Sequence, residues 1–322
     1  MESLAADSTV KLINTEDGEI LTPYSDAIDV AHILLFRLTD KLNIYLQEVL
    51  SSPGSESLHD FRITIRKIRS VLSQLSDILP EPGLSYQQAA FKNVMDRTSL
   101  LRDIEVCNRM MLDAEKKSSQ DNKLKPIQEQ IQIYESNERE KLAEYLNSDE
   151  FHHFIRQWEG FLENACHLER KLERSNTPIR LVASEAIGFR YMKVMKQARK
   201  ALKDKKDIKQ IHKLRKSGKK LRYLVDVFSD LYPARATNRV IKKLKKLQDC
   251  LGSMQDSEVQ IHLINQLSDS INGELDKDNR MAIEKIIRKR NQQKQRHYKQ
   301  ALKLIQNYSN GSAITMDNLI RL

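Results

Sequence analysis

Two short basic segments of the chain place a histidine and three cations at helical spacing. HDFRITIRKIR begins at His59, and HKLRKSGKKLR begins at His212. At 100° per residue, offsets of three, seven and ten residues from the histidine fall within an arc of about 80°. The resulting stripes are His59, Arg62, Arg66 and Arg69, and His212, Arg215, Lys219 and Arg222. These residue types suit phosphate oxygens, because arginine offers a planar fork, lysine a point charge and imidazole a directional N–H.

The two segments belong to a longer repeat with a shift of 153 residues, since 212 − 59 = 153. Aligning 59–106 with 212–259 without a gap gives 12 identities in 48 positions, most of them polar. The identical pairs include Lys67/Lys220, Pro80/Pro233, Lys92/Lys245, Asp96/Asp249, Asp103/Asp256 and Glu105/Glu258. Packing alone tolerates any hydrophobe of similar volume and leaves surface charges free to drift. The retained charges therefore indicate a role beyond solubility.

The apolar residues of the two segments lie opposite the basic stripes. They are Phe61, Ile68, Leu72 and Leu75 in the first and Leu214, Leu221, Leu224 and Phe228 in the second. We therefore expect amphipathic helices that turn their cations away from the core. Aligned like charges repel by about 0.2–0.5 kcal/mol per neighbouring pair. One such stripe is typical of a solvated face, whereas two matched stripes favour a cleft that binds a polyanion.

Several other polar residues are candidates for supporting roles. Arg37 and Arg190 obey the same shift, whereas Arg139 and Arg296 match only with a slip of four residues, since 296 − 139 = 157. Four aspartates, Asp96, Asp103, Asp249 and Asp256, are expected to orient the arginines by hydrogen bonds rather than to act as metal ligands or general bases. No metal site is predicted, because His152 and His153 are adjacent and no histidine pair has ligand spacing.

Helical periodicity and sparse glycine and proline predict an all-α chain. The expected helices span 23–51, 56–79, 84–117, 123–147, 149–173, 178–204, 207–231, 236–250, 254–270 and 274–309. Residues 1–22 are expected to form a disordered tail, followed by one repeat over about 23–175 and another over about 176–322. No apolar run approaches the roughly 20 residues of a membrane span, so no membrane partner is predicted.

The overall composition favours anionic partners. The chain has 322 residues, with 54 Lys and Arg against 44 Asp and Glu, which gives a net charge of +10. Its three cysteines, Cys107, Cys166 and Cys250, lack metal-like spacing and predict reduced thiols in a cytoplasmic protein.

At its two basic segments the sequence resembles the CHAD family, the conserved histidine α-helical domain. Both segments have the family pattern His-x-x-Arg-x-x-x-Arg/Lys-Arg/Lys-x-Arg, and the resemblance extends through Leu101-Arg102-Asp103-Ile104-Glu105-Val106 and its counterpart near 247–259. The resemblance implies two four-helix bundles related by a pseudo-twofold axis, with a basic channel between them. It also implies non-enzymatic binding of inorganic polyphosphate, with no cofactor. The residues before His59 are too few and too helical for the triphosphatase domain fused to many relatives, which suggests a stand-alone member.

The resemblance implies ten polyphosphate-binding residues: His59, Arg62, Arg66, Lys67, Arg69, His212, Arg215, Lys219, Lys220 and Arg222. Two other functions stay open at the level of sequence. One is RNA or DNA binding, favoured by the net charge, and the other is a phosphohydrolase that uses His59 or His212 with a nearby aspartate. A cytoplasmic location is predicted, with polyphosphate granules as one place for such a protein, and the oligomeric state is left open.

Overall fold

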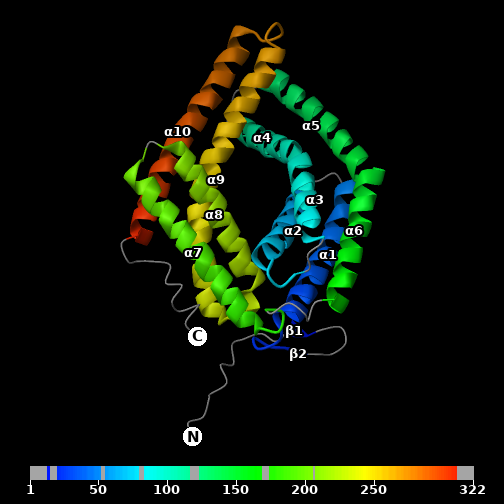
Figure 1. The fold of residues 1–322 in the computed structure, drawn as a ribbon. Coiled ribbons are helices and arrows are strands. Elements are labelled where there is room, and N and C mark those ends of the chain that lie inside the picture. The colour runs from blue at the N-terminus through cyan, green and yellow to red at the C-terminus, as the bar shows by residue number, and fades with distance from the viewer. Residues whose placement is uncertain are drawn as a thin grey trace.

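A computed structural model describes residues 13–14, 20–51, 55–79, 83–116, 123–168, 174–205 and 207–309. The predicted all-α fold class is confirmed (Figure 1). The helices are α1 (Ala27–Ser51), α2 (Ser55–Gln74), α3 (Leu84–Arg97), α4 (Ser99–Lys116), α5 (Lys125–Leu146), α6 (Asp149–Leu168), α7 (Ile179–Lys203), α8 (Ile208–Val227), the 3₁₀ turn η1 (Ser229–Leu231), α9 (Ala234–Ser270) and α10 (Lys277–Ser309). Within the described residues, no helix is both long and apolar enough to span a bilayer.

The segment that precedes α1 contains one short strand pair. Strand β1 (Ile13–Asn14) pairs antiparallel with β2 (Ile20–Leu21). These residues lie within the tail that was expected to be disordered, and most of that tail lies outside the described residues. Further along, Asp26 forms an isolated bridge with Pro178, and the Ala27 amide donates to the Thr177 carbonyl at 3.0 Å. The starts of α1 and α7 are therefore held side by side.

The helices pack in two main groups that meet at α2 and α8. One group contains α1, α2, α3 and α6, and the other contains α7, α8, α9 and α10 (Figure 1). A single apolar cluster runs through both groups and includes Phe61 and Leu214. Helices α4 and α5 pack instead with α9, in a second cluster that includes Ile104 and Ile264. Helices α2 and α8 contact each other, and each also packs against other helices of its own group.

The bounds of corresponding helices follow the shift found in the sequence. Adding 153 to the bounds of α2 gives those of α8, since 55 + 153 = 208 and 74 + 153 = 227. The start of α1 maps to within one residue of the start of α7, since 27 + 153 = 180. That an internal repeat relates the halves by a pseudo-twofold axis stays a prediction.

The sequence predicts one helix over 84–117, but the structure interrupts it at Thr98. The Thr98 hydroxyl donates to the Val94 carbonyl at 3.0 Å, and the Ser99 hydroxyl donates to the Met95 carbonyl at 2.7 Å. These side chains compete with backbone amides for the same acceptors, which favours a helix end. Helix α4 restarts at Ser99.

In the second half the structure has one helix where the sequence predicts two. Helix α9 replaces the two predicted helices 236–250 and 254–270. Leu247, Leu251 and Met254 are buried along one face of α9. Burying one such side chain stabilises by about 1.5–3 kcal/mol, which exceeds the cost of about 1 kcal/mol for Gly252 inside the helix. Leu251 is also the counterpart of Thr98, since 98 + 153 = 251, and it has no hydroxyl to compete with the backbone.

Candidate anion-binding site

A basic pocket lies between α2, α3 and α8. Its volume is about 560 Å³, and its described lining residues include six cations and no acid. The cations are Arg66 and Arg69 from α2, Lys92 from α3, and Lys216, Lys219 and Lys220 from α8. Uncharged polar groups, among them Ser70, Ser73, Gln74, Ser85 and Gln88, complete much of the wall. The pocket thus offers positive charge from two facing helices together with hydroxyl and amide groups that suit an anion with many oxygens.

Four of the ten predicted binding residues line this pocket: Arg66, Arg69, Lys219 and Lys220. Arg66 Nη1 lies 3.4 Å from the Tyr223 hydroxyl, and neither it nor the other three has an acid within ion-pair distance in the described part of the chain. Two pocket cations, Lys92 and Lys216, were not among the predicted site residues. The identity of Lys92 with Lys245 in the repeat was a usable signal for the first, whereas Lys216 has isoleucine as its counterpart.

Lys67 does not line the pocket and instead pairs with an acid of α8. Its Nζ lies 2.7 Å from Asp226 Oδ2. The 153-residue shift relates Lys67 to Lys220 and Ser73 to Asp226, since 67 + 153 = 220 and 73 + 153 = 226. Lys67 and Asp226 thus form an ion pair, whereas their counterparts Lys220 and Ser73 both line the pocket. The replacement of an acid by serine thus leaves Lys220 unneutralised on the pocket side.

Lys219 is the most strongly perturbed cation of the pocket. Burial lowers the pKa of its ammonium group to about 7, and the charges of Arg215 and Arg66 act in the same direction. Asp256 opposes this shift but does not reverse it. Burial, which disfavours the charged form, is thus the main cause of the low pKa of Lys219, and the neighbouring cations add to it.

Arg62 corrects the expectation that the whole stripe faces away from the core. Only 6% of its surface is exposed, because α2 packs against α3 and α4 on this face as well as against α1. Arg62 Nη1 donates to the Met95 carbonyl at 3.0 Å and to the Thr98 hydroxyl, and Nη2 donates to the Ser99 hydroxyl at 3.3 Å. Burial lowers the pKa of this guanidinium to about 10. These contacts favour a structural role for Arg62, at the break between α3 and α4.

Arg215, its counterpart in α8, has a different environment. The counterparts of Thr98 and Ser99 are Leu251 and Gly252, which offer no hydroxyl. As in Arg62, the Nε atom of Arg215 is buried without a hydrogen-bond partner and burial lowers the pKa, but within the described residues Arg215 has no counterpart of the Arg62 Nη hydrogen bonds. Arg222 Nε is likewise unpartnered, while its guanidinium lies 5.0 Å from the Tyr223 ring centroid. The charges of Arg215 and Arg222 act on Lys219, but neither arginine lines the pocket.

Replacing Arg62 by methionine is expected to lower the free energy of unfolding by about 2–3 kcal/mol, because buried acceptors at the α3–α4 break lose a charged donor. Arg215→Met is the matched control, and its effect is expected to stay below about 1 kcal/mol because no hydrogen bond is lost. Urea unfolding followed by circular dichroism measures both values. Equal destabilisation by the two substitutions would contradict the structural role of Arg62.

The two histidines lie in the second turns of α2 and α8 and do not line the pocket. His59 and His212 are both half-buried. Burial lowers the pKa of His59, and the charge of Arg102 acts in the same direction. Within the described residues, no group of three or more histidine, cysteine, aspartate or glutamate side chains could hold a metal ion.

Within the described residues, no hydrogen bond joins any of the four aspartates to Arg62, Arg66, Arg69, Arg215 or Arg222. Asp96 lies 3.6 Å from Lys92, and Asp249 is exposed. Burial raises the pKa of Asp103, with the charge of Asp256 acting in the same direction. Burial also raises the pKa of Asp256, which Arg215 and Lys219 oppose. Asp103 and Asp256 thus act on the cations through their charge, and the predicted orienting bonds are not present.

The four arginines that the sequence suggests for supporting roles, Arg37, Arg139, Arg190 and Arg296, do not gather at one site. Arg190 lies beside the pocket, because its Nε donates to the Gln74 side chain at 2.6 Å. Arg37 is exposed on α1, and Arg296 lies with Lys299 in a separate shallow depression on α10.

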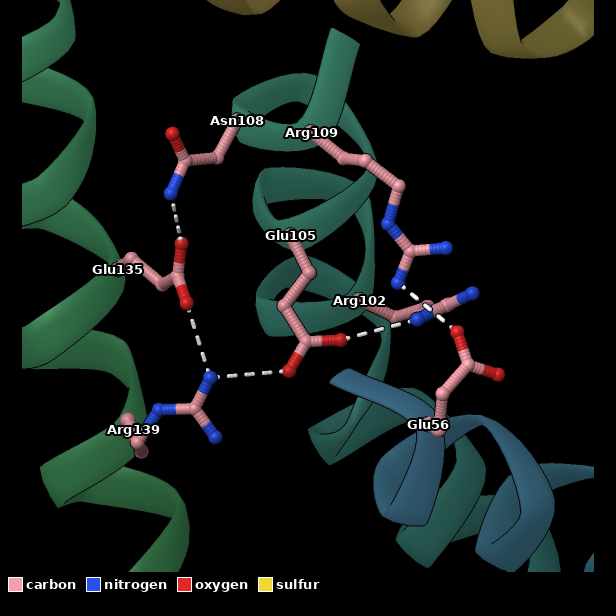
Figure 2. Close-up of polar contacts among 7 residues, drawn as sticks. All are labelled: Glu56, Arg102, Glu105, Asn108, Arg109, Glu135 and Arg139. Carbon is pink, nitrogen blue, oxygen red and sulfur yellow. Dashed lines mark hydrogen bonds and ion pairs between the residues drawn. The ribbon is translucent and has the colours of Figure 1, made fainter. Parts of the chain in front are cut away.

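Arg139 belongs to a polar network between α4 and α5 (Figure 2). Its Nη2 atom donates to Glu105 Oε1 at 3.0 Å and to Glu135 Oε1 at 2.9 Å. The other Glu105 oxygen accepts from Arg102 at 3.1 Å. In the second half, Glu258, the counterpart of Glu105, lies 3.5 Å from Lys294. These contacts favour a structural role for Arg139.

A family model for the CHAD domain matches residues 34–265, which is well over half of the chain. The chain therefore belongs to the CHAD family. It is similar to the crystal structure of the CHAD domain from the plant Ricinus communis, with 18% identity and a TM-score of 0.73 over 89% of this chain and 93% of that one. It is also similar to PptA from Streptomyces chartreusis, with 11% identity and a TM-score of 0.63 over 88% of this chain and 100% of that one. At these identities both similarities establish the fold alone. Among curated protein sequences, none matches this chain.

Proposed function

We propose that the protein binds inorganic polyphosphate in the pocket between α2 and α8, without hydrolysing it. The observation that carries the proposal is the set of six lining cations with no acid among the described lining residues. Such a concentration of like charge is unfavourable until an anion neutralises it. The resemblance to the CHAD family supports the same ligand.

A linear chain of phosphates suits the arrangement of the cations. Arg66 and Arg69 offer planar forks from one wall, while Lys219 and Lys220 offer point charges from the other. Each phosphate of a chain carries negative charge, so one ligand can meet several of these groups at once. A single small anion would leave most of the six cations unpaired.

Nucleic acid is the second candidate, favoured by the net charge of +10. The described lining residues of the pocket offer one aromatic ring, Tyr223, and it is only 5% exposed. Stacking on aromatic rings supports single-strand recognition, and this pocket gives bases little such surface. We therefore expect long-chain polyphosphate to displace labelled RNA at fixed salt, with RNA a poor competitor for bound polyphosphate. Stronger competition by RNA would favour the second function.

The proposal of binding without catalysis also has a direct test. His59 and His212 were the candidate nucleophiles, and neither lines the pocket. Incubation with polyphosphate and Mg²⁺ is expected to release no inorganic phosphate above the protein-free rate. Release that disappears in His59→Gln or His212→Gln would instead establish a phosphohydrolase.

Affinity for polyphosphate is expected to fall about tenfold between pH 7 and pH 8.5, because the phosphate chain favours the protonated form of Lys219. Because the pKa of Lys219 is about 7, the free protein loses the Lys219 proton between pH 7 and pH 8.5. Binding at the higher pH must therefore be coupled to the uptake of a proton. Lys219→Arg, which stays charged, is the matched control and should flatten the dependence. Isothermal titration at several pH values measures the affinity. If the affinity of the Lys219→Arg variant fell with pH as steeply as that of the original protein, Lys219 would not be the cause of the pH dependence.

A further inference from the structure

Lys219 differs from the other lysines of the pocket in its surroundings. It is half-buried in the pocket wall, whereas its neighbours on α8, Lys216 and Lys220, are exposed. The charged groups that act on Lys219 are Arg215 and Arg222 from its own helix, Arg66 from α2 and Asp256 from α9. No acid lies within ion-pair distance of its Nζ atom in the described part of the chain. Its amine thus faces an anion site without a carboxylate to hold its proton.

We propose that Lys219 is a site of acylation by small acyl phosphates that dock in the pocket through their phosphate group. The inference rests on the proposed function in one respect, that this pocket attracts phosphate. Arg66, Arg69 and Lys220 can hold the phosphate of such a molecule while its acyl carbon approaches the amine. Two conditions for a selective reaction, a nucleophile and a binding group for the reagent, therefore meet in one cavity.

The reaction balances without any further reagent. The uncharged amine of Lys219 attacks the acyl carbon and forms a carbon–nitrogen bond. The carbon–oxygen bond to phosphate breaks, and inorganic phosphate leaves with the electron pair. The amine proton passes to solvent, which gives a neutral amide that can no longer take up a proton when polyphosphate binds. Acylation would thereby weaken the binding of polyphosphate at the same site.

The protonation state of Lys219 supports this chemistry. With a pKa of about 7, Lys219 is a free amine in most protein molecules at pH 7.5, whereas an ordinary lysine is a free amine in about 0.1% of them. Lower basicity reduces the reactivity of each free amine, so the gain in rate is smaller than the gain in free amine. We expect the net advantage over exposed lysines to be about tenfold.

The test uses acetyl phosphate as the reagent and the full chain as the substrate, with acetylated peptides measured by mass spectrometry at pH 7.5. The initial rate at Lys219 is expected to exceed the rate at Lys216 about tenfold. It should saturate with acetyl phosphate concentration and fall when inorganic phosphate is added. A succinimidyl acetate reagent, which has no phosphate, should show no saturation. Lys242→Arg, at an exposed position of α9 that does not line the pocket, is the matched control and should leave the rate at Lys219 unchanged.

Two results would overturn the proposal. One is acetylation at Lys219 no faster than at Lys216. The other is fast acetylation that neither saturates nor responds to phosphate, because the reagent then does not dock. The assay contains no polyphosphate, so its result is separate from the proposed function. Polyphosphate binding with an unreactive Lys219 rejects only this inference, whereas selective acetylation without polyphosphate binding rejects only the proposed function.

Discussion

The double substitution Arg69→Glu and Lys220→Glu is expected to lower the affinity for long-chain polyphosphate by about 100-fold or more while leaving helicity intact. Loss of one partner from a desolvated charge pair costs about 2–5 kcal/mol in comparable interfaces. The two glutamates would also pair with the remaining pocket cations and fill the site with internal ion pairs. Lys220 is exposed and Arg69 half-buried, so the fold has room for both changes. Isothermal titration measures the affinity, and circular dichroism the helicity.

A matched control reverses the same amount of charge elsewhere. Lys242 and Lys245 are exposed on α9 and do not line the pocket, so their double reversal to glutamate should cost less than tenfold. Ser73→Asp provides a milder probe, because it places in the pocket an acid at the position equivalent to Asp226, which pairs with Lys67. We expect it to weaken binding about tenfold by engaging Lys220. Equal losses from the α9 and pocket reversals would mean that net charge, and not this pocket, governs binding.

Replacing Glu105 by glutamine is expected to lower the free energy of unfolding by about 3 kcal/mol. The Glu105 side chain is 1% exposed and joins Arg102 of its own helix to Arg139 of α5 (Figure 2). Removing one member of a buried ion pair leaves the remaining charges uncompensated, which typically costs about 3–5 kcal/mol. The two arginines are partly exposed, so the lower end of that range applies. Urea unfolding measures the change.

The same substitution at the counterpart position is the control. Glu258 is 42% exposed and lies 3.5 Å from Lys294, so Glu258→Gln should cost less than about 1 kcal/mol. Neither substitution touches the pocket, so polyphosphate affinity should change less than twofold in both folded variants. Equal destabilisation at the two positions would contradict the structural difference between the halves.

The helices and the general location of the site could be predicted from the sequence, because both depend on local patterns. Helical periodicity set the helix bounds to within a few residues for most elements, and the charge stripes pointed to α2 and α8, which line the basic pocket. The break at Thr98 could not be predicted, because it depends on hydroxyl groups and on Arg62, which is distant in sequence. Tertiary contacts thus overrode a continuous helical pattern.

The sequence could not predict which individual cations line the pocket, because equivalent residues of the two repeated helices have different neighbours. Arg62 and Arg215 occupy equivalent positions in the stripes, yet Thr98 and Ser99 bind the first, and Leu251 stands where Thr98 would be. A stripe on one helix defines which residues share a face, but only the packing of other helices decides which of them remain available to a ligand. Helical angles within α2 and α8 carry no information on that packing.

The most direct measurement of the central claim is a crystal structure of the protein soaked or grown with medium-chain polyphosphate. We predict a chain of phosphate density in the pocket, in contact with Arg66 and Arg69 on one wall and Lys219 and Lys220 on the other. Density on the outer face of α10 near Arg296 and Lys299, with the pocket between α2 and α8 empty, would contradict it.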